Sequence, residues 1–169
     1  TTLAQIRRHN ARPPENIINR RILSLIKVKN MSETITEYTG DSFDASVSRP
    51  LNQSYHVLGK LYAGEYPGDK NKDTAETKLK RMYHFGVRHF IDLTEEGELR
   101  QYSNLLPKDT TYMRFPIKDL NAPESIEAVH DLIGRINYLT QMNGYTYLHC
   151  WGGVGRTGTI TACYFARTI

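Results

Sequence analysis

Residues 149–158 read HCWGGVGRTG, and this stretch is the most informative in the chain. Three glycines stand between Cys150 and Arg156, and a glycine-rich loop lets successive backbone N–H groups turn inward around a tetrahedral oxyanion. The strand-forming YTYLH (145–149) precedes this loop, and the apolar run TGTITACYFA (157–166) follows it. We therefore predict a strand, an anion-binding loop, and a helix that begins near Arg156 with its positive N-terminal end toward the anion.

The side chains of this loop suit phosphoryl transfer. Arg156 offers a planar fork of donors that fits two phosphate oxygens. A positive cradle of this kind lowers the pKa of Cys150 toward the nucleophilic thiolate, which predicts a phosphocysteine intermediate. The alternative for Cys150 is a buried small hydrophobe, the usual state of a free cysteine, but the surrounding glycines favour the nucleophile. We expect Cys163 on the following helix to pack in the core, with a redox partner as the alternative.

HCWGGVGRTG resembles the signature loop of the cysteine-based protein tyrosine phosphatases, HC-x5-R-[ST], and fits best the compact dual-specificity-like branch. The resemblance implies that Cys150 is the nucleophile and that Arg156 binds phosphate and stabilises the transition state. It also implies that Thr157 assists the departing thiolate and that His149 helps to fix the loop and the cysteine pKa. The implied phosphate-binding loop consists of Trp151, Gly152, Gly153, Val154, Gly155 and Arg156.

A second loop supplies a candidate proton donor. FPIKDLNAP at 115–123 resembles the loop of the same family that carries its general acid, which makes Asp119 the candidate. Such an acid protonates the leaving oxygen and afterwards takes a proton from the water that hydrolyses the phosphoenzyme. The alternative is that Asp119 caps the turn before the next helix, a task for which Asn121 and Ser125 are equally placed. We expect Asp92 to order its neighbouring loop and not to act in catalysis.

Composition restricts the functional classes. The length of 169 residues fits one domain. The net charge of the chain is +4. Two cysteines suit a reducing, cytoplasmic setting, and no apolar run reaches the length of a membrane span. No His/Cys group has zinc spacing, so we expect neither a metal nor a cofactor. Residues 1–30 are basic, and we interpret this as the solvated face of amphipathic helices, with nucleic acid or an anionic membrane as the alternative partners.

The order of segments predicts an α/β fold. Strands are expected near 55–63, in GVRHFIDL (86–93) and at 111–117, and helices at 73–85 and 123–142. Strands that alternate with helices indicate a central, mostly parallel twisted sheet of about four to five strands flanked by helices. The anion loop then lies at the carboxyl end of a strand, where such sheets bind ligands.

The resemblance also implies one or two further helices after the signature helix. Residues 1–30 resemble that continuation, so we hypothesise a permuted order in which they pack as the closing helices. Residues 31–54 would then be a polar linker or mobile segment, and 55–169 the catalytic domain. The alternatives are a separate N-terminal extension and a fragment of a tandem array.

The predicted function is that of a phosphoprotein phosphatase acting on phosphotyrosine, with phosphoserine and phosphothreonine left open. The x5 stretch of the signature loop contains no lysine, which argues against inositol-lipid substrates. The main alternative is a non-catalytic phosphopeptide-binding module, and a lipid or other phosphomonoester phosphatase is a lesser one. Sulfur transfer and arsenate reduction fit less well. The oligomeric state is left open.

Overall fold

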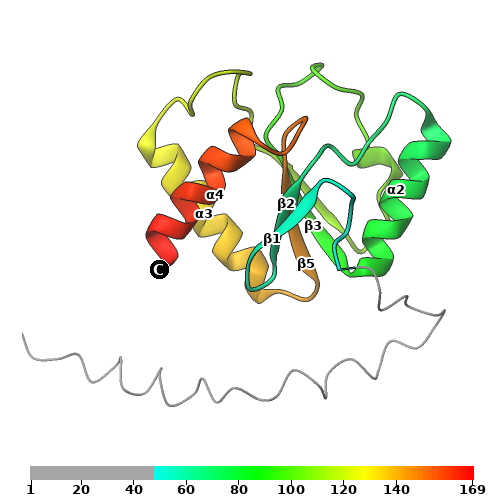
Figure 1. The fold of residues 1–169 in the computed structure, drawn as a ribbon, viewed down its shortest axis with the longest axis horizontal. Coiled ribbons are helices and arrows are strands. Elements are labelled where there is room, and N and C mark those ends of the chain that lie inside the picture. The colour runs from blue at the N-terminus through cyan, green and yellow to red at the C-terminus, as the bar shows by residue number, and fades with distance from the viewer. Residues whose placement is uncertain (1–47) are drawn as a thin grey trace, which may run out of the picture. The chain divides into compact units, whose positions relative to one another are not determined.

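The computed structural model describes residues 48–169, which belong to a compact unit spanning Phe43–Ile169. Its centre is a five-stranded sheet in the order β1-β2-β5-β3-β4 (Figure 1). Only β1 is antiparallel to its neighbour, and the other three pairs are parallel. This confirms the predicted mostly parallel α/β sheet. The strands are Ser54–Leu58 (β1), Leu61–Gly64 (β2), Val87–Asp92 (β3), Thr111–Arg114 (β4) and Tyr145–His149 (β5).

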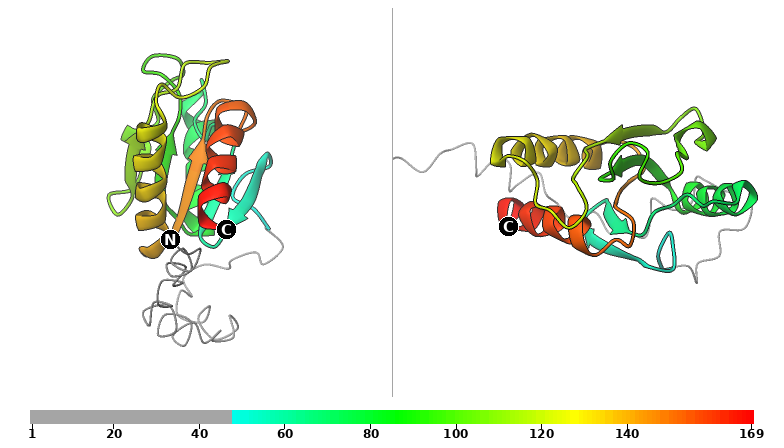
Figure 2. Two further views of the ribbon diagram at one scale, coloured as in Figure 1. Left: turned by 90° about the vertical axis from the view of Figure 1, so that its left-hand side faces the viewer. Right: turned by 90° about the horizontal axis from the view of Figure 1, so that it is seen from above.

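Helices cover both faces of the sheet. α3 (Ile126–Gln141) and α4 (Gly155–Thr168) lie side by side on one face, and α2 (Lys72–Phe85) covers the other (Figures 1 and 2). A short 3-10 turn, η1 (Ser103–Leu105), precedes β4. The arrangement makes three layers, with the carboxyl ends of the parallel strands at one edge.

Two apolar cores result from the alternation of side chains along the central strands. Ile91 of β3 and Leu148 of β5 point into the core beneath α3 and α4. Their chain neighbours Phe90 and Tyr147 point into the core beneath α2. Successive strand residues face opposite sides of a sheet, so a central strand between two helical layers is apolar on both faces. This explains why HFIDL and YTYLH read as nearly continuous buried runs.

The helix boundaries follow local capping. The Asn71 side chain accepts hydrogen bonds from the first turn of α2, and Ser125 accepts one from Ala128 N–H at the start of α3. These are the side chains expected at an N-cap. Ser125, and not Asp119, therefore caps α3. The strand predicted at 111–117 ends at Arg114, although backbone bonds from Phe115 to Asp92 and from Ile117 to Leu93 extend the pairing.

The packed domain begins slightly before residue 55. Leu51 is buried against the α2 core, and the Ser54 hydroxyl bonds the Leu51 carbonyl at 2.6 Å. The helices expected within 1–30, and residues 31–47 of the expected linker, lie outside the described residues. Within residues 48–169, no helix is long and apolar enough to cross a membrane.

Candidate active site

The loop of residues 150–156, here called the anion loop, joins the carboxyl end of β5 to the start of α4, as predicted. Its Trp151 carbonyl accepts a hydrogen bond from Tyr66 N–H at 2.8 Å. Gly153 has a φ of +75°, and a Cβ placed there would lie 2.2 Å from the backbone of Gly64 at the end of β2. The loop is therefore pressed against β2, and only glycine allows this approach.

Cys150 lies at the floor of the anion loop with 4% of its surface exposed. Burial by itself would raise the pKa of its thiol. Hydrogen bonds from the Thr157 hydroxyl, the Thr157 N–H and the Gly153 N–H, together with the charge of Arg156, instead bring the pKa below its ordinary value. The buried Thr157 hydroxyl has no nitrogen or oxygen partner among residues 48–169, so its proton is available to the sulfur. These donors favour the thiolate.

Arg156 is also 4% exposed, and two acidic side chains contact its guanidinium. Nη1 and Nη2 donate to the two carboxylate oxygens of Glu98 at 2.7 and 2.6 Å. Nη1 also donates to the Ile117 carbonyl at 3.0 Å, and Nη2 lies 3.3 Å from the Asp119 carboxylate. No acceptor for the Arg156 Nε–H is found among residues 48–169. Of the five donors of an arginine, Nε–H and the Nη2 hydrogen facing Asp119 are thus left for a ligand.

Glu98 was not identified from the sequence. It follows β3 in a turn where its carboxylate also accepts a hydrogen bond from Glu95 N–H at 3.0 Å. The hydrogen bonds from Arg156 hold the pKa of Glu98 below its ordinary value. Because both carboxylate oxygens of Glu98 bind the Arg156 guanidinium, the paired hydrogen bonds allow the guanidinium little rotation. Glu98 therefore orients Arg156. The only sequence signal was an acidic segment after a strand.

His149 is fully buried one residue before Cys150. Burial lowers the pKa of its imidazole, although Asp92 opposes this effect. The neutral ring faces the Cys150 carbonyl through Nδ1 at 3.0 Å and the Tyr102 hydroxyl through Nε2 at 2.6 Å. A carbonyl only accepts, so Nδ1 carries the proton and Nε2 accepts from Tyr102. Tyr102 was also not identified from the sequence.

Asp92 ends β3 beneath the site and is almost fully buried. Its carboxylate accepts hydrogen bonds from the Thr94 N–H and hydroxyl at 2.8 and 2.7 Å, and from the Tyr112 hydroxyl at 2.8 Å. Burial would raise the pKa of Asp92, but its interactions with His149 and these donors lower it overall. Asp92 therefore orders the start of the loop that carries Glu98, which is the structural role expected from the sequence.

Asp119 lies on the loop of residues 115–123, here called the acid loop, between β4 and α3. Its side chain is 58% exposed, and its carboxylate reaches the site only through the contact with Arg156. The next residue, Leu120, is 98% exposed and has a φ of +60°. It is the single non-glycine residue among 48–169 with positive φ. Such strain is uncommon and accumulates at functional sites.

The remaining candidate residues form the mouth of the site. Trp151 and Val154 are exposed, and Cβ atoms added at Gly152 and Gly155 would meet nothing within 4 Å. Cys163 is partly buried and packs against the core beneath α3 and α4, as expected. The contacts described above bring four of the candidate residues together around one point: Cys150, Arg156, Thr157 and Asp119.

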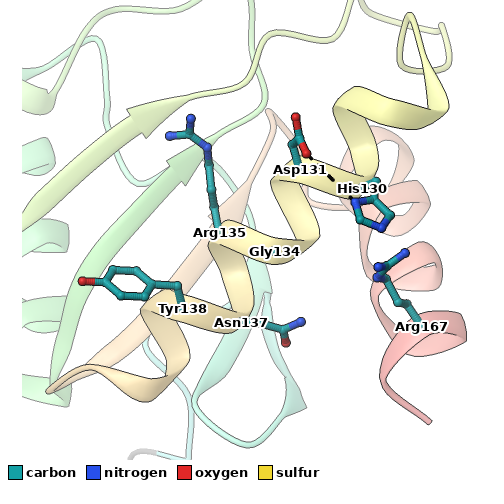
Figure 3. A pocket seen from close by; sticks show the side chains of 7 residues that line it. All are labelled: His130, Asp131, Gly134, Arg135, Asn137, Tyr138 and Arg167. Atoms are coloured by element: carbon teal, nitrogen blue, oxygen red, sulfur yellow. Dashed lines mark ion pairs between the residues drawn. The ribbon is translucent and has the colours of Figure 1, made fainter.

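A separate hollow lies far from this point. It is formed along α3 and at the last turn of α4, where Arg167 approaches His130 (Figure 3). The anion loop is at the opposite end of α4, which is 14 residues or roughly 20 Å long. No group of three or more His, Cys, Asp or Glu side chains within the described part of the chain is placed to hold a metal ion.

Comparisons with known proteins show the family to which the chain is related. Protein 067L of Invertebrate iridescent virus 3, named as a tyrosine phosphatase, is 34% identical over 125 residues, 70% of this chain and 48% of its own length. Protein 197R of Invertebrate iridescent virus 6, named likewise, is 37% identical over 75% of this chain and 46% of its own. The chain thus spans about half the length of these relatives.

Solved structures share the fold. The crystal structure of Tk-PTP in its active form superimposes with a TM-score of 0.59, at 21% identity over 70% of this chain and 76% of that one. Kinase-associated phosphatase gives a TM-score of 0.52 at 21% identity, over 64% of this chain and 67% of that one. The sequence model of the family described as "Polymorphic toxin system, DSP-PTPase phosphatase" matches residues 65–169. The chain therefore belongs to this family of dual-specificity-type tyrosine phosphatases.

Proposed function

We propose that residues 55–169 form a catalytic domain that hydrolyses phosphotyrosine in proteins, and also phosphoserine or phosphothreonine where the side chain reaches the loop. The observation that carries the proposal is the convergence of the Cys150 thiol, the Arg156 guanidinium and the Asp119 carboxylate on one point. A reduced thiol is required, so we place the reaction in a reducing compartment such as the cytoplasm.

In the first step, the Cys150 thiolate attacks phosphorus, and the S–P bond forms as the bond to the tyrosine oxygen breaks. The N–H groups of Trp151 to Arg156 surround the phosphoryl oxygens, and helix α4 directs its N-terminus toward them. Arg156 binds two of these oxygens through Nε and Nη2, while Glu98 and the Ile117 carbonyl hold its other donors. Glu98 is therefore a positioning residue for the clamp.

Asp119 supplies the proton that the leaving oxygen needs. Its carboxylate now faces Arg156 Nη2 at 3.3 Å, which is the position that a bound phosphate would claim. Phosphate binding therefore displaces the carboxylate from the arginine toward the leaving oxygen. In the second step, Asp119 takes a proton from the water that attacks phosphorus, and the S–P bond breaks with release of inorganic phosphate.

Two further groups support the sulfur. The Thr157 hydroxyl donates to the thiolate both before attack and as it departs. His149, held in one tautomer by Tyr102, donates to the Cys150 carbonyl and so fixes the backbone from which the nucleophile projects. Their expected effect is on the pKa and the leaving ability of the thiolate, not on phosphate binding.

The test is turnover of p-nitrophenyl phosphate and phosphotyrosine peptides, measured as phosphate release. Wild type should turn over, Cys150→Ser should be inactive, and the matched control Cys163→Ser should retain the wild-type rate. Activity that survives in Cys150→Ser would rule out the phosphocysteine step. Binding of phosphopeptides without turnover by wild type would instead identify a phosphopeptide-binding module. A parallel panel of phosphoinositides distinguishes a lipid phosphatase.

A further inference from the structure

A hollow of about 450 Å³ opens directly beside the anion loop, on the side formed by the β2–α2 connection. Its lining includes Trp151 and Gly152 of the anion loop, together with the cationic side chains of Lys70 and Arg100. A peptide whose phosphorylated side chain reaches Cys150 must place its neighbouring residues near the exposed Trp151. The hollow is therefore within reach of residues that flank the phosphorylated one.

The charges that line this hollow are unevenly paired. Asp69 is 3.6 Å from the Lys78 ammonium, and Glu98 is bound by Arg156. Two cations are left without a carboxylate: neither Lys70 nor Arg100 makes an ion pair among residues 48–169. Glu65, the remaining acid, accepts a hydrogen bond from Gln53 N–H at 3.1 Å.

Backbone contacts hold Arg100 at this position. Its Nη1 donates to the Lys70 carbonyl at 2.6 Å, and its own carbonyl accepts a hydrogen bond from the Tyr66 hydroxyl. These two bonds join the segment after β2 to the segment after β3. Because the guanidinium has five donors and uses one here, most of its fork can still bind an anion.

We propose that this hollow is a subsite for a second anionic group of the substrate, carried by a residue that flanks the phosphorylated one. The proposal rests on the phosphatase activity proposed above and specifies its substrate class: an acidic phosphopeptide. A carboxylate and a second phosphate share the required chemistry, since both present paired oxygens to Arg100 with Lys70 as an additional cation.

The experiment compares phosphotyrosine peptides that differ only in one flanking residue. Glutamate is placed at each position beside the phosphotyrosine in turn, with glutamine as the neutral match, and phosphoserine is compared with serine at the same positions. For wild type, kcat/KM should favour the anionic peptide by roughly 3- to 10-fold at the best position, which is the effect expected of a partly buried ion pair. A larger preference for phosphoserine than for glutamate would identify a second phosphate as the source.

Substitutions of the two cations test whether the preference for anionic peptides arises in this hollow. Arg100→Gln keeps a donor for the Lys70 carbonyl but removes the charge, and Lys70→Gln removes the second cation. Each should reduce the preference, and the double variant should bring it below about 2-fold, with p-nitrophenyl phosphate turnover unchanged. Lys108→Gln, an exposed lysine outside the hollow, is the matched control and should keep the full preference.

The same peptides are also bound to Cys150→Ser protein, where the preference is measured as a ratio of Kd values. This measurement tests the subsite even if wild type shows no turnover, so failure of the phosphatase proposal remains distinguishable. Equal binding of the glutamate and glutamine peptides at every position, and of the phosphoserine and serine peptides, would overturn the subsite. A preference that persists in the double variant would overturn it as well.

Discussion

Cys150 and Arg156 in the anion loop are each 4% exposed, whereas the side chain of Asp119 in the acid loop is 58% exposed. The anion loop is pressed against Gly64 and held by hydrogen bonds to its backbone and side chains. The acid loop reaches the site through one contact at 3.3 Å and carries a strained Leu120. The difference supports the proposed order of events, in which the phosphate cradle exists before substrate binds and Asp119 moves toward the leaving oxygen afterwards.

The acid loop can be tested first, because its removal has the largest expected effect. Asp119→Ala should lower kcat by roughly 10²–10⁴-fold on phosphotyrosine peptides, since the leaving oxygen then departs without a proton. The loss should be smaller on p-nitrophenyl phosphate, whose leaving group needs less protonation. Substrate binding should be retained or slightly tighter, because phosphate no longer displaces the Asp119 carboxylate from Arg156. Asp131→Ala on α3 is the control that should leave kcat intact. A near-normal rate in Asp119→Ala would assign the acid elsewhere.

The preformed cradle is tested by adding one methyl group. Gly153→Ala should lower kcat/KM by about 10²-fold, because its Cβ would lie 2.2 Å from the Gly64 backbone at a φ of +75° and the loop must shift. Gly152→Ala is the matched control, since a Cβ there would meet nothing within 4 Å. Steady-state kinetics and circular dichroism distinguish a displaced loop from a lost fold. Equal activity of both variants would contradict a rigid cradle.

The pH dependence of Cys150 alkylation tests whether the anion loop stabilises the thiolate before substrate binds. The pKa of Cys150 is lowered, so alkylation by iodoacetate should rise with pH and reach its plateau below the pH at which an ordinary thiol does. Thr157→Val removes a donor to the thiolate, so its pKa should rise and alkylation at neutral pH should fall several-fold. The exposed Thr159→Val on the same helix should leave the profile unchanged. An unaltered alkylation profile for Thr157→Val would show that the Thr157 hydroxyl does not stabilise the Cys150 thiolate.

The smallest effect is expected from the strained residue. Leu120→Gly relieves a positive φ that costs about 1 kcal/mol, but glycine loses about as much in chain entropy, so the free energy of unfolding should change by less than about 0.5 kcal/mol. Turnover of peptides should nevertheless fall a few-fold because the acid loop is less well defined. Leu132→Ala, in the core, should cost about 2–5 kcal/mol and serves as the contrast in thermal unfolding. A stability loss of that size in Leu120→Gly would show that the acid loop is part of the rigid fold.

Much of the fold was predictable because its signals are local. The glycine spacing and the flanking apolar runs predicted the strand, loop and helix around Cys150, and the alternation of helices and strands predicted the parallel sheet. Asp119 came from a resemblance, because a lone aspartate in a turn has no distinguishing local pattern. The boundaries near Arg114 and Leu51 were less accurate, since pairing and burial by distant residues set them.

The sequence alone pointed to the groups for which we propose chemistry: a thiol and a guanidinium at a recognisable spacing, and a carboxylate through a family resemblance. The residues that hold these groups in place became visible only in the folded chain. Glu98 is 58 residues from Arg156, and Tyr102 is 47 residues from His149, yet each pair is in hydrogen-bond contact. The carboxyl ends of β3 and β5 are neighbours in the parallel sheet, so the loops that leave them meet at one edge. No local pattern encodes such a meeting, because it depends on the order in which the strands pair.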